Sequence, residues 1–305
     1  MNHNDHSNLQ PLDQGIARAA RFPQWLMAVA GGAIVVIAWA WLSVQSAGVM
    51  AFSTEELGPG MRILEPALGW IAERAKTSPF FESLLYLCTP QSLSSDLATF
   101  ATLFSMWLAM SVAMMLPSAA PMLRTYADIA HVARERGETT VSLSVLAGGY
   151  IFIWGVFALA IAALQMAIMI GLNAGAAAPL VGWIGGFILL GAGLYQFSAL
   201  KDACLEKCRN PFNTLFASWR TDRSGVFKLG IEQGVFCIGC CWAIMLVMFV
   251  VGTMNLVWMA FFTLFAIVEK SGRGNVTSLV SGCILMFWGG ALLVLAALTD
   301  LGVTI

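Results

Sequence analysis

Long stretches of this sequence carry no charged residue and no histidine. Residues 97–123, 143–200 and 233–268 contain none of them. About 20 apolar residues are enough for one helix to cross a bilayer, and the polar–apolar alternation of half-buried strands is absent. A helix also satisfies its own backbone hydrogen bonds in lipid. The pattern therefore predicts an all-α fold, a polytopic bundle of transmembrane helices.

Seven apolar runs predict seven spans. The first follows the polar residues 1–24 and exceeds the apolar core of about 7–15 residues that is typical of a cleaved signal peptide, so we expect an uncut signal anchor. The short segment 252–255 predicts a helical hairpin of the fifth and sixth spans. Gly182 and Gly186 in the fourth form a small-xxx-small pair suited to close packing. The predicted spans cover residues 25–44, 97–117, 146–170, 180–199, 229–251, 254–269 and 277–298.

The spans divide the chain into five parts. Within the first loop, residues 61–76 have the pattern of an amphipathic helix that lies on the membrane or on the bundle. The predicted parts are a polar cytoplasmic tail (1–24), the first span (25–49), a periplasmic loop with the amphipathic helix (50–96), a six-helix membrane domain that would bind metal (97–298) and a short outer tail (299–305).

Basic residues set the expected orientation, because cytoplasmic loops are enriched in Lys and Arg. With the N-terminus inside and the C-terminus outside, thirteen of the sixteen basic residues lie in cytoplasmic segments. The other three, Arg62, Arg74 and Lys76, fall in the long first loop, where the rule is weak. We therefore expect a multi-pass protein of a bacterial inner (cytoplasmic) membrane.

Composition agrees with a membrane protein and excludes one function class. Of the 305 residues, 59% are hydrophobic and 11% are charged, whereas a soluble domain carries about 25% charged residues. The net charge is −1, and no basic arm or aromatic platform is present. We therefore expect the lipid bilayer as a partner and no nucleic acid.

Three of the seven cysteines lie close together in the fifth predicted span. At 100° per residue, Cys237, Cys240 and Cys241 fall within an arc of about 100°, so one helix face carries three thiols. Met248 continues the same face. In the interiors of the predicted spans we expect no carboxylate or histidine, the usual proton relays, and no charged partner beside these thiols.

The second predicted span carries a methionine stripe. Met106, Met110 and Met114 share one face at i, i+4 and i+8. At 1.5 Å per residue, the thiols lie about 12–18 Å from the cytoplasmic side, and Met106 to Met110 lie about 10–17 Å from it. We therefore expect the two faces to meet. Sulfur ligands without imidazole or carboxylate select Cu(I), and Zn(II) is a poorer second without histidine.

A second cysteine pair lies at the cytoplasmic end of the fourth span. Cys204 and Cys208 are one helical turn apart, with Lys201, Lys207 and Arg209 nearby. Positive neighbours favour the thiolate form that binds metal, and a stable disulfide is not expected in the reducing cytoplasm. The pair is interpreted as an entry or exit clamp for a soft metal. The same charges are also consistent with a simple positive-inside flank.

Packing explains part of this pattern equally well. Cys and Met are common core fillers, so a methionine stripe at helical spacing is more often packing than ligand. We expect Cys88, Cys283 and Met286 to be structural, His131 to be solvated, and His3 and His6 to lie in a disordered tail.

Several of these motifs occur together in a fixed order. They are the Met-rich run before Pro117 and Pro121, the segment 201–211 with Cys204, Cys208 and Arg209, the core Cys237-Ile-Gly-Cys240-Cys241-Trp242, the hairpin Met254-Asn255-Leu-Val-Trp258-Met259, and Glu269-Lys270.

This combination resembles a bacterial family described as predicted metal-binding integral membrane proteins, whose members are often labelled copper chaperones. The similarity covers about residues 97–295. The resemblance implies metal binding by the cysteines and methionines at the matching positions, which are Cys204, Cys208, Cys237, Cys240, Cys241, Met110 and Met114.

Three functions remain open from the sequence. The first is a Cu(I)-binding membrane protein that acts as a chaperone, store or facilitator, with a copper donor or acceptor protein, or a membrane complex, as partner. The second is an enzyme, a membrane thiol–disulfide oxidoreductase that uses Cys237 with Cys240 or Cys241, since spacing alone does not separate redox from metal use. The third is a structural or assembly subunit. The predicted depth of the thiols favours the non-enzymatic reading.

Overall fold

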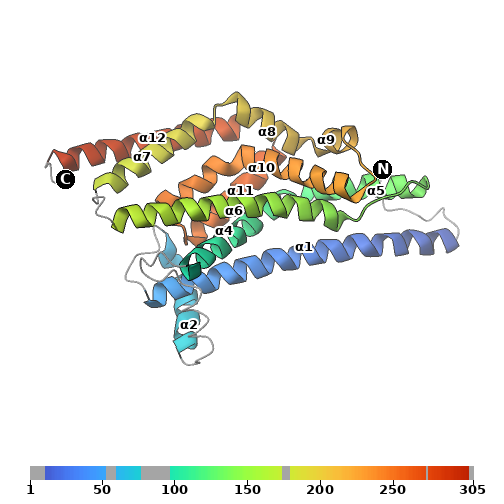
Figure 1. The fold of residues 1–305 in the computed structure, drawn as a ribbon, viewed down its shortest axis with the longest axis horizontal. Helices are drawn as coiled ribbons and strands as arrows, with labels where there is room; N and C mark the ends of the chain where they lie inside the picture. The colour runs from blue at the N-terminus through green and yellow to red at the C-terminus, as the bar shows by residue number, and fades with distance from the viewer. Residues whose placement is uncertain (1–10, 53–59, 77–96, 174–178, 273, 302–305) are drawn as a thin grey trace.

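The computed structural model describes residues 11–52, 60–76, 97–173, 179–272 and 274–301, and within these ranges the regular structure is entirely helical (Figure 1). The predicted all-α class is therefore confirmed. The elements are α1 (Pro11–Phe52), a 3-10 turn (Met61–Ile63), α2 (Glu65–Lys76), α4 (Leu97–Ser118), α5 (Ala120–Glu135), α6 (Leu143–Asn173), α7 (Pro179–Tyr195), α8 (Ala199–Arg209), α9 (Pro211–Ala217), α10 (Arg223–Val251), α11 (Leu256–Ser271) and α12 (Val276–Asp300).

Five of the described helices are long and apolar enough to cross a membrane. They are Val29–Val49 of α1, all of α4, Leu143–Gly171 of α6, α10 and α12. A sixth candidate combines α7 and α8, which are bent by 63° at the intervening break. At 16 residues, α11 is shorter than a usual span of about 20. The count of seven spans and the orientation therefore stay predictions.

The turn between α10 and α11 is formed by a glycine with a positive φ and an asparagine that caps α11. Gly252 adopts a φ of 102°, which favours glycine. Asn255 then caps α11, because its side-chain oxygen accepts a hydrogen bond from the Trp258 amide at 3.2 Å. The expected tight connection of these two helices is thus present. However, α11 packs more extensively along α4 than along α10.

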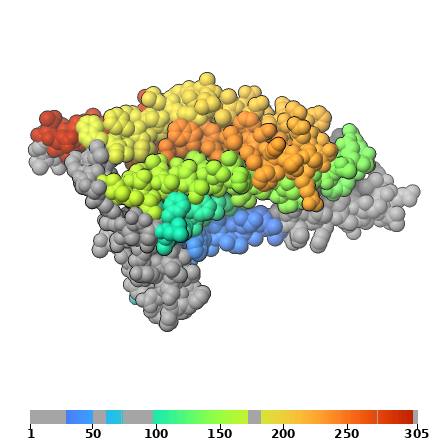
Figure 2. Space-filling model, in the orientation of Figure 1, coloured from blue at the N-terminus to red at the C-terminus, as the bar shows by residue number. Residues whose placement is uncertain are grey.

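The long helices run roughly side by side, with α10 at the centre of the arrangement (Figure 1). The most extensive contacts of α10 are with α6, α8 and α7, while α4 lies between α6, α1 and α11. Figure 2 shows α6 and α10 in close contact on one face, with α7 to α9 above them. Most buried side chains belong to one continuous core that includes the cysteines of α10 and the methionines of α4.

Glycines set the closest approach of neighbouring helices. A Cβ added at Gly186 of α7 would lie 2.5 Å from the side chain of Leu293 on α12, and one at Gly182 would lie 3.5 Å from Ala296. The predicted small-residue contact of α7 is therefore confirmed, and its partner is α12. On α6, a Cβ at Gly149 would overlap the backbone of α10.

Several expectations concern segments outside the described residues. His3 and His6 lie within 1–10, Cys88 lies within 77–96, and most of the outer tail lies within 302–305. Residues 61–76 form the 3-10 turn and α2.

Candidate metal site

Cysteines from two helices converge where α8 packs against α10. Cys237, Cys240 and Cys241 are all buried on α10. The sulfur of Cys240 lies 3.3 Å from that of Cys241 and 3.9 Å from that of Cys208 on α8. Two groups of cysteines that are distant in the sequence therefore form one sulfur cluster.

Cys204, the other cysteine of α8, also lies against α10. A Cβ added at Gly239 of α10 would lie 2.5 Å from its sulfur, so Cys204 packs directly over the α10 backbone. Gly239 leaves the space that this contact needs. We use the name sulfur cluster for the five free cysteines that α8 and α10 contribute, which are Cys204, Cys208, Cys237, Cys240 and Cys241. Cys283 is exposed on α12 and is not a member.

The sulfur spacing fits a metal held by two thiolates. With metal–sulfur bonds of about 2.3 Å, two thiolates that share one trigonal or tetrahedral metal lie about 3.8–4.0 Å apart. The pair Cys208 and Cys240 matches this separation at 3.9 Å. Across the described residues, no three His, Cys, Asp or Glu side chains converge into a closed metal cage. The sulfur cluster is therefore open: Cys240 contacts Cys241 and Cys208, but no three ligands surround one point.

A buried lysine lies against this sulfur cluster. The ammonium of Lys270 donates to the Cys237 sulfur at 3.0 Å and to the Ser118 hydroxyl at 2.7 Å. The Tyr150 hydroxyl lies 3.1 Å from the same sulfur and 3.2 Å from the carbonyl oxygen of Met115. The expectation of no charged partner beside these thiols is therefore wrong. The reason is that α11 continues past its apolar run, so its last turn carries Lys270 back into the bundle.

A second buried lysine lies on the other side of the same helix end. The Lys201 ammonium is 2.5 Å from the Glu269 carboxylate, and both side chains are fully buried. Ser278 donates to the same carboxylate oxygen at 2.8 Å, and Lys201 also bonds to Gln196. Glu269, the last residue of the predicted sixth span, is therefore buried in the bundle, where the lysine from α8 neutralises it.

Arg209 anchors the other end of α8. Its guanidinium donates to the carbonyl oxygen of Glu269 at 2.8 and 2.9 Å and to that of Gly274 at 2.9 Å. Lys201 and Arg209 therefore both tie α8 to the end of α11. The charged residues of α8 do more than flank a membrane helix, because they fix the orientation in which Cys204 and Cys208 meet α10.

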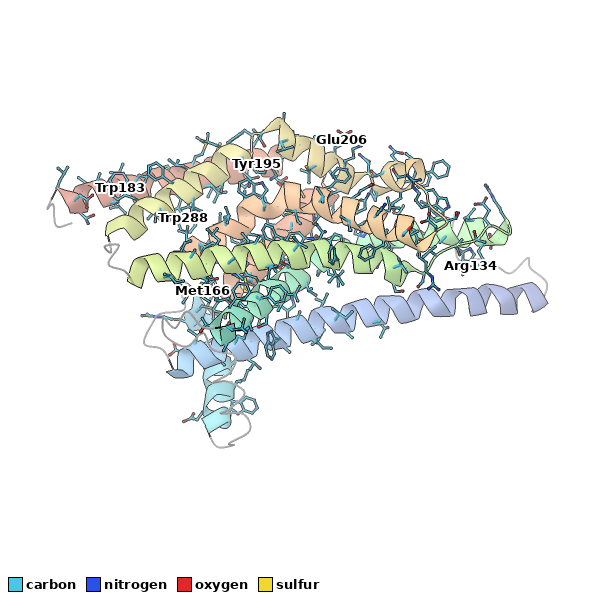
Figure 3. The ribbon with its side chains drawn as sticks, viewed as in Figure 1. Arg134, Met166, Trp183, Tyr195, Glu206 and Trp288 are labelled. Atoms are coloured by element: carbon cyan, nitrogen blue, oxygen red, sulfur yellow. The ribbon has the colours of Figure 1, made fainter. Side chains whose placement is uncertain are left out.

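Tyr195 holds α10 at Gly239, the residue that Cys204 also packs against. It lies at the end of α7, where Figure 3 labels it, and its hydroxyl donates to the Gly239 carbonyl at 2.5 Å. Its ring packs edge-on against Trp242, with 4.9 Å between the ring centroids. The α10 segment that carries the thiols is thus held by polar side chains from α6, α7 and α11.

The methionine stripe of α4 is completely buried. Met106, Met110 and Met114 are each at most 1% exposed and belong to the same core as the cysteines. The stripe therefore faces into the bundle. A direct meeting of these sulfurs with the thiols, within about 8 Å, stays a prediction.

Two contacts fix the register of α4 against α10. Near one end, Lys270 joins Ser118 to Cys237. Near the other end, the rings of Trp107 and Phe249 lie 5.2 Å apart. The two helices are therefore antiparallel here, and interpolation between the contacts places Met114 level with Cys240 and Cys241. The beginning of the stripe lies near Phe249.

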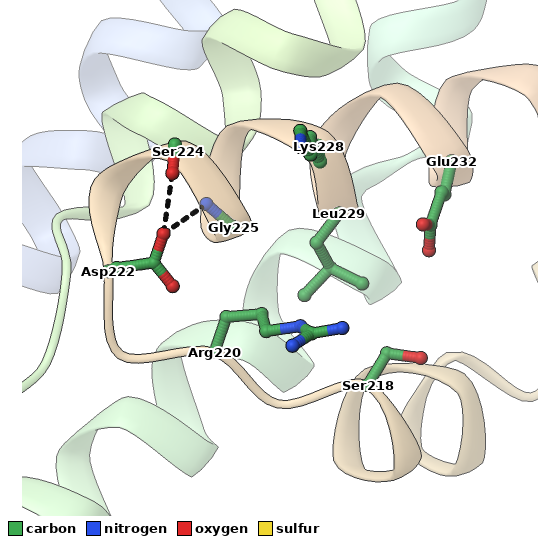
Figure 4. A pocket seen from close by; sticks show the side chains of 8 residues that line it. All are labelled: Ser218, Arg220, Asp222, Ser224, Gly225, Lys228, Leu229 and Glu232. Atoms are coloured by element: carbon green, nitrogen blue, oxygen red, sulfur yellow. Dashed lines mark hydrogen bonds between the residues drawn. The ribbon is translucent and has the colours of Figure 1, made fainter.

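A polar cavity of about 240 Å³ opens where the chain enters α10 (Figure 4). Asp222 caps the helix by accepting from the Gly225 amide at 2.7 Å and the Ser224 hydroxyl at 2.6 Å. These bonds lower the pKa of the Asp222 carboxyl. No sulfur lines the cavity, so it is separate from the sulfur cluster. Its lining residues are Ser218, Arg220, Asp222, Ser224, Gly225, Lys228, Leu229 and Glu232.

The polar contacts around the sulfur cluster do not follow from the sequence. Glu269 and Lys270 directly follow an apolar run, where the sequence predicts a span end and a loop. The sequence does contain one signal, because this charged pair follows the apolar run closely enough to continue the same helix. Its partners, however, lie far away in the sequence. Lys201, Glu269 and Lys270 stand out in the sequence only as a basic flank and a motif, and the residues with no signal there are Ser118, Tyr150, Gln196 and Ser278.

The sequence region that contains this site matches one known protein family. A family model described as PpoB2, copper chaperone, matches residues 104–292. The matched region is more than half of the chain and contains the complete sulfur cluster together with both buried lysines. No curated protein and no solved structure matches the chain. The chain therefore belongs to the PpoB2 family of copper chaperones.

Proposed function

We propose that this protein binds Cu(I) inside the membrane and acts as a copper chaperone, store or facilitator. The observation that carries the proposal is the sulfur cluster, in which α8 and α10 bring thiols to 3.9 Å from one another. Soft sulfur donors without nearby imidazole favour Cu(I), with Zn(II) less suited to the site. The family description supports copper as the cargo.

The two cysteine groups are proposed to have different roles. Cys237, Cys240 and Cys241 form the deep part, and Met114 of α4 is proposed to supply a thioether beside them. Cys204 and Cys208 belong to α8, the shorter and more polar helix, and pass the ion between the cytoplasm and the deep thiols. Because Cys208 already lies beside Cys240, this transfer needs no large movement of α8.

The proposed setting is a bacterial inner membrane that the chain crosses seven times, with the N-terminus inside. The distribution of basic residues supports this orientation, and five to six of the described helices have suitable length and composition. Reporter fusions after residues 75 and 305 should report the outer side, and one after residue 215 the cytoplasm. A cytoplasmic C-terminus would contradict the topology.

We further propose that a copper donor or acceptor approaches at the polar cavity of α10. Leu229 lines that cavity, and Gln233 and Cys237 follow it on the same helix face at i+4 and i+8. Gln233 is buried, and no hydrogen bond is formed by its side-chain nitrogen in the described structure. This line of residues leads from the cavity to the first deep thiol.

The central experiment is anaerobic copper binding by purified protein. Changing Cys237, Cys240 and Cys241 together to serine should abolish tight Cu(I) binding in competition with a Cu(I)-specific chelator. The matched control is Cys283→Ser, which lies outside the sulfur cluster and should bind as the parent does. Parental stoichiometry and affinity in the triple variant would overturn the proposal.

One observation favours a second candidate. Lys270 stabilises a thiolate at Cys237, which is also what a thiol–disulfide oxidoreductase needs. In that case an intramolecular disulfide between Cys237 and Cys240 or Cys241 should form and be regenerated with a quinone as the electron acceptor. Redox titration with a soluble quinone analogue distinguishes this activity from metal binding.

A further inference from the structure

Lys270 occupies an unusual position for a cation. Its ammonium is almost completely buried and lies between the sulfur of Cys237 and the hydroxyl of Ser118. In the part of the chain that the structure describes, no carboxylate forms an ion pair with it, because the neighbouring Glu269 is paired with Lys201. Among the described basic side chains, Lys270 alone lies within hydrogen-bonding distance of a sulfur.

A positive charge in this position needs a negative partner. Burying an unpaired ion is strongly unfavourable. The ionisable groups that face Lys270 are the thiols of Cys237, Cys240 and Cys241, together with the Tyr150 hydroxyl and, one sulfur further away, Cys208. The counter-anion of Lys270 is therefore supplied by the sulfur cluster itself.

The positive charge of Lys270 adds to the charge of any metal–thiolate complex beside it, so it decides which metal gives a neutral site. A Cu(I) ion with two thiolates carries one negative charge, so the complex and the ammonium together are neutral. A Zn(II) ion with two thiolates is already neutral, so the ammonium adds one uncompensated positive charge. A thioether such as Met114 adds no charge and alters neither result. Uncompensated charge is costly in a site that excludes water.

From this we infer that Lys270 determines metal specificity, by making a two-thiolate site favour a monovalent soft cation over a divalent one. The inference rests on the proposed copper function and deepens it. It depends on the open arrangement of the sulfur cluster, because three thiolates around Zn(II) would also be neutral beside Lys270. Within the described residues, no group of three His, Cys, Asp or Glu side chains is placed to hold one metal ion.

The test compares metal preference in full-length protein reconstituted in lipid nanodiscs under anaerobic conditions. Affinities for Cu(I) and Ag(I), both monovalent, and for Zn(II) and Cd(II), both divalent, are measured by chelator competition. In Lys270→Met, the ratio of Cu(I) to Zn(II) affinity should fall at least about tenfold. Lys270→Arg keeps the charge and should keep the parental ratio. Ag(I) should follow Cu(I), and Cd(II) should follow Zn(II).

A second uncharged variant keeps the test valid if Lys270→Met does not fold. Lys270→Gln has no charge but still donates to Ser118, and it should show the same loss of preference as Lys270→Met. Folded protein is verified for each variant by circular dichroism and size-exclusion chromatography. An unchanged preference in either folded neutral variant overturns the inference alone. Failure of the parent to bind Cu(I) overturns the proposed function instead.

Discussion

Two buried lysines flank the end of α11, and their surroundings differ in one decisive respect. Lys201 meets the carboxylate of Glu269 at 2.5 Å, with further hydrogen bonds around the pair. Lys270 meets the sulfur of Cys237 at 3.0 Å. The first contact is a salt bridge between a lysine and a carboxylate, whereas in the second the lysine meets a thiol group, whose anionic form also binds soft metals.

Because of this difference, we assign a structural role to the Lys201–Glu269 pair and a functional role to the Lys270–Cys237 pair. The Lys201–Glu269 pair balances its own charges, and its role is to hold α8 against α11. In the Lys270–Cys237 contact, the thiolate can bind a metal in addition to the lysine, so this contact can take part in metal binding. One helix end thus positions the cysteines of α8 through Glu269 and sets the charge around the cysteines of α10 through Lys270.

The largest expected effect is on stability. Lys201→Met leaves Glu269 buried without its cation, which should lower the free energy of unfolding by about 3–5 kcal/mol. Lys270→Met should cost less, because Cys237 can take up a proton and become neutral. Unfolding in mild detergent measures both. The double variant Lys201→Met, Glu269→Gln should recover much of the loss, and a larger loss in Lys270→Met than in Lys201→Met would contradict the comparison.

The next effect concerns the cysteines that α8 contributes. Removing Cys208 takes away the sulfur that lies 3.9 Å from Cys240, so Cys208→Ala should weaken Cu(I) binding by about 100-fold, or roughly 2.7 kcal/mol. Cys283→Ala, on the exposed face of α12, should leave the affinity unchanged. Chelator competition measures both. Equal affinities would show that α8 contributes no ligand.

The methionine stripe offers a smaller and more selective test. The register of α4 places Met114 level with the deep thiols and Met106 several turns away. Met114→Leu should therefore weaken Cu(I) binding by about tenfold, or roughly 1.4 kcal/mol. Met106→Leu has the same buried environment and should leave the affinity unchanged. If both variants bind as the parent does, the stripe is packing alone.

Local patterns in the sequence predicted much of this structure. Apolar runs of sufficient length predicted the helices, and helical periodicity placed Cys237, Cys240 and Cys241 on one face. The position of Gly182 and Gly186 predicted a close helix contact. Each of these features depends on residues within a few turns of one another, so the chain itself contains the information.

The polar surroundings of the thiols could not be predicted in the same way. Whether Glu269 and Lys270 end a helix in solvent or enter the bundle depends on Lys201, Ser118 and Cys237, all far away in the sequence. The approach of α8 to α10 likewise depends on the 63° bend after α7. Tertiary contacts decided these features, and a pattern within one segment does not reveal them.

The smallest predicted effect separates hydrogen bonding from charge. Tyr150→Phe removes the hydroxyl that lies 3.1 Å from the Cys237 sulfur. The Met115 carbonyl, which this hydroxyl also contacts, still accepts from Ser118 and from the Ala119 amide. No buried acceptor is then left without a donor, so the unfolding free energy and the Cu(I) affinity should each change by at most about 1 kcal/mol. Because Lys270 keeps its charge, the ratio of Cu(I) to Zn(II) affinity should stay parental in the same competition assay. A loss of preference as large as in Lys270→Met would mean that the hydrogen bonds to Cys237, and not the ammonium charge, select the metal.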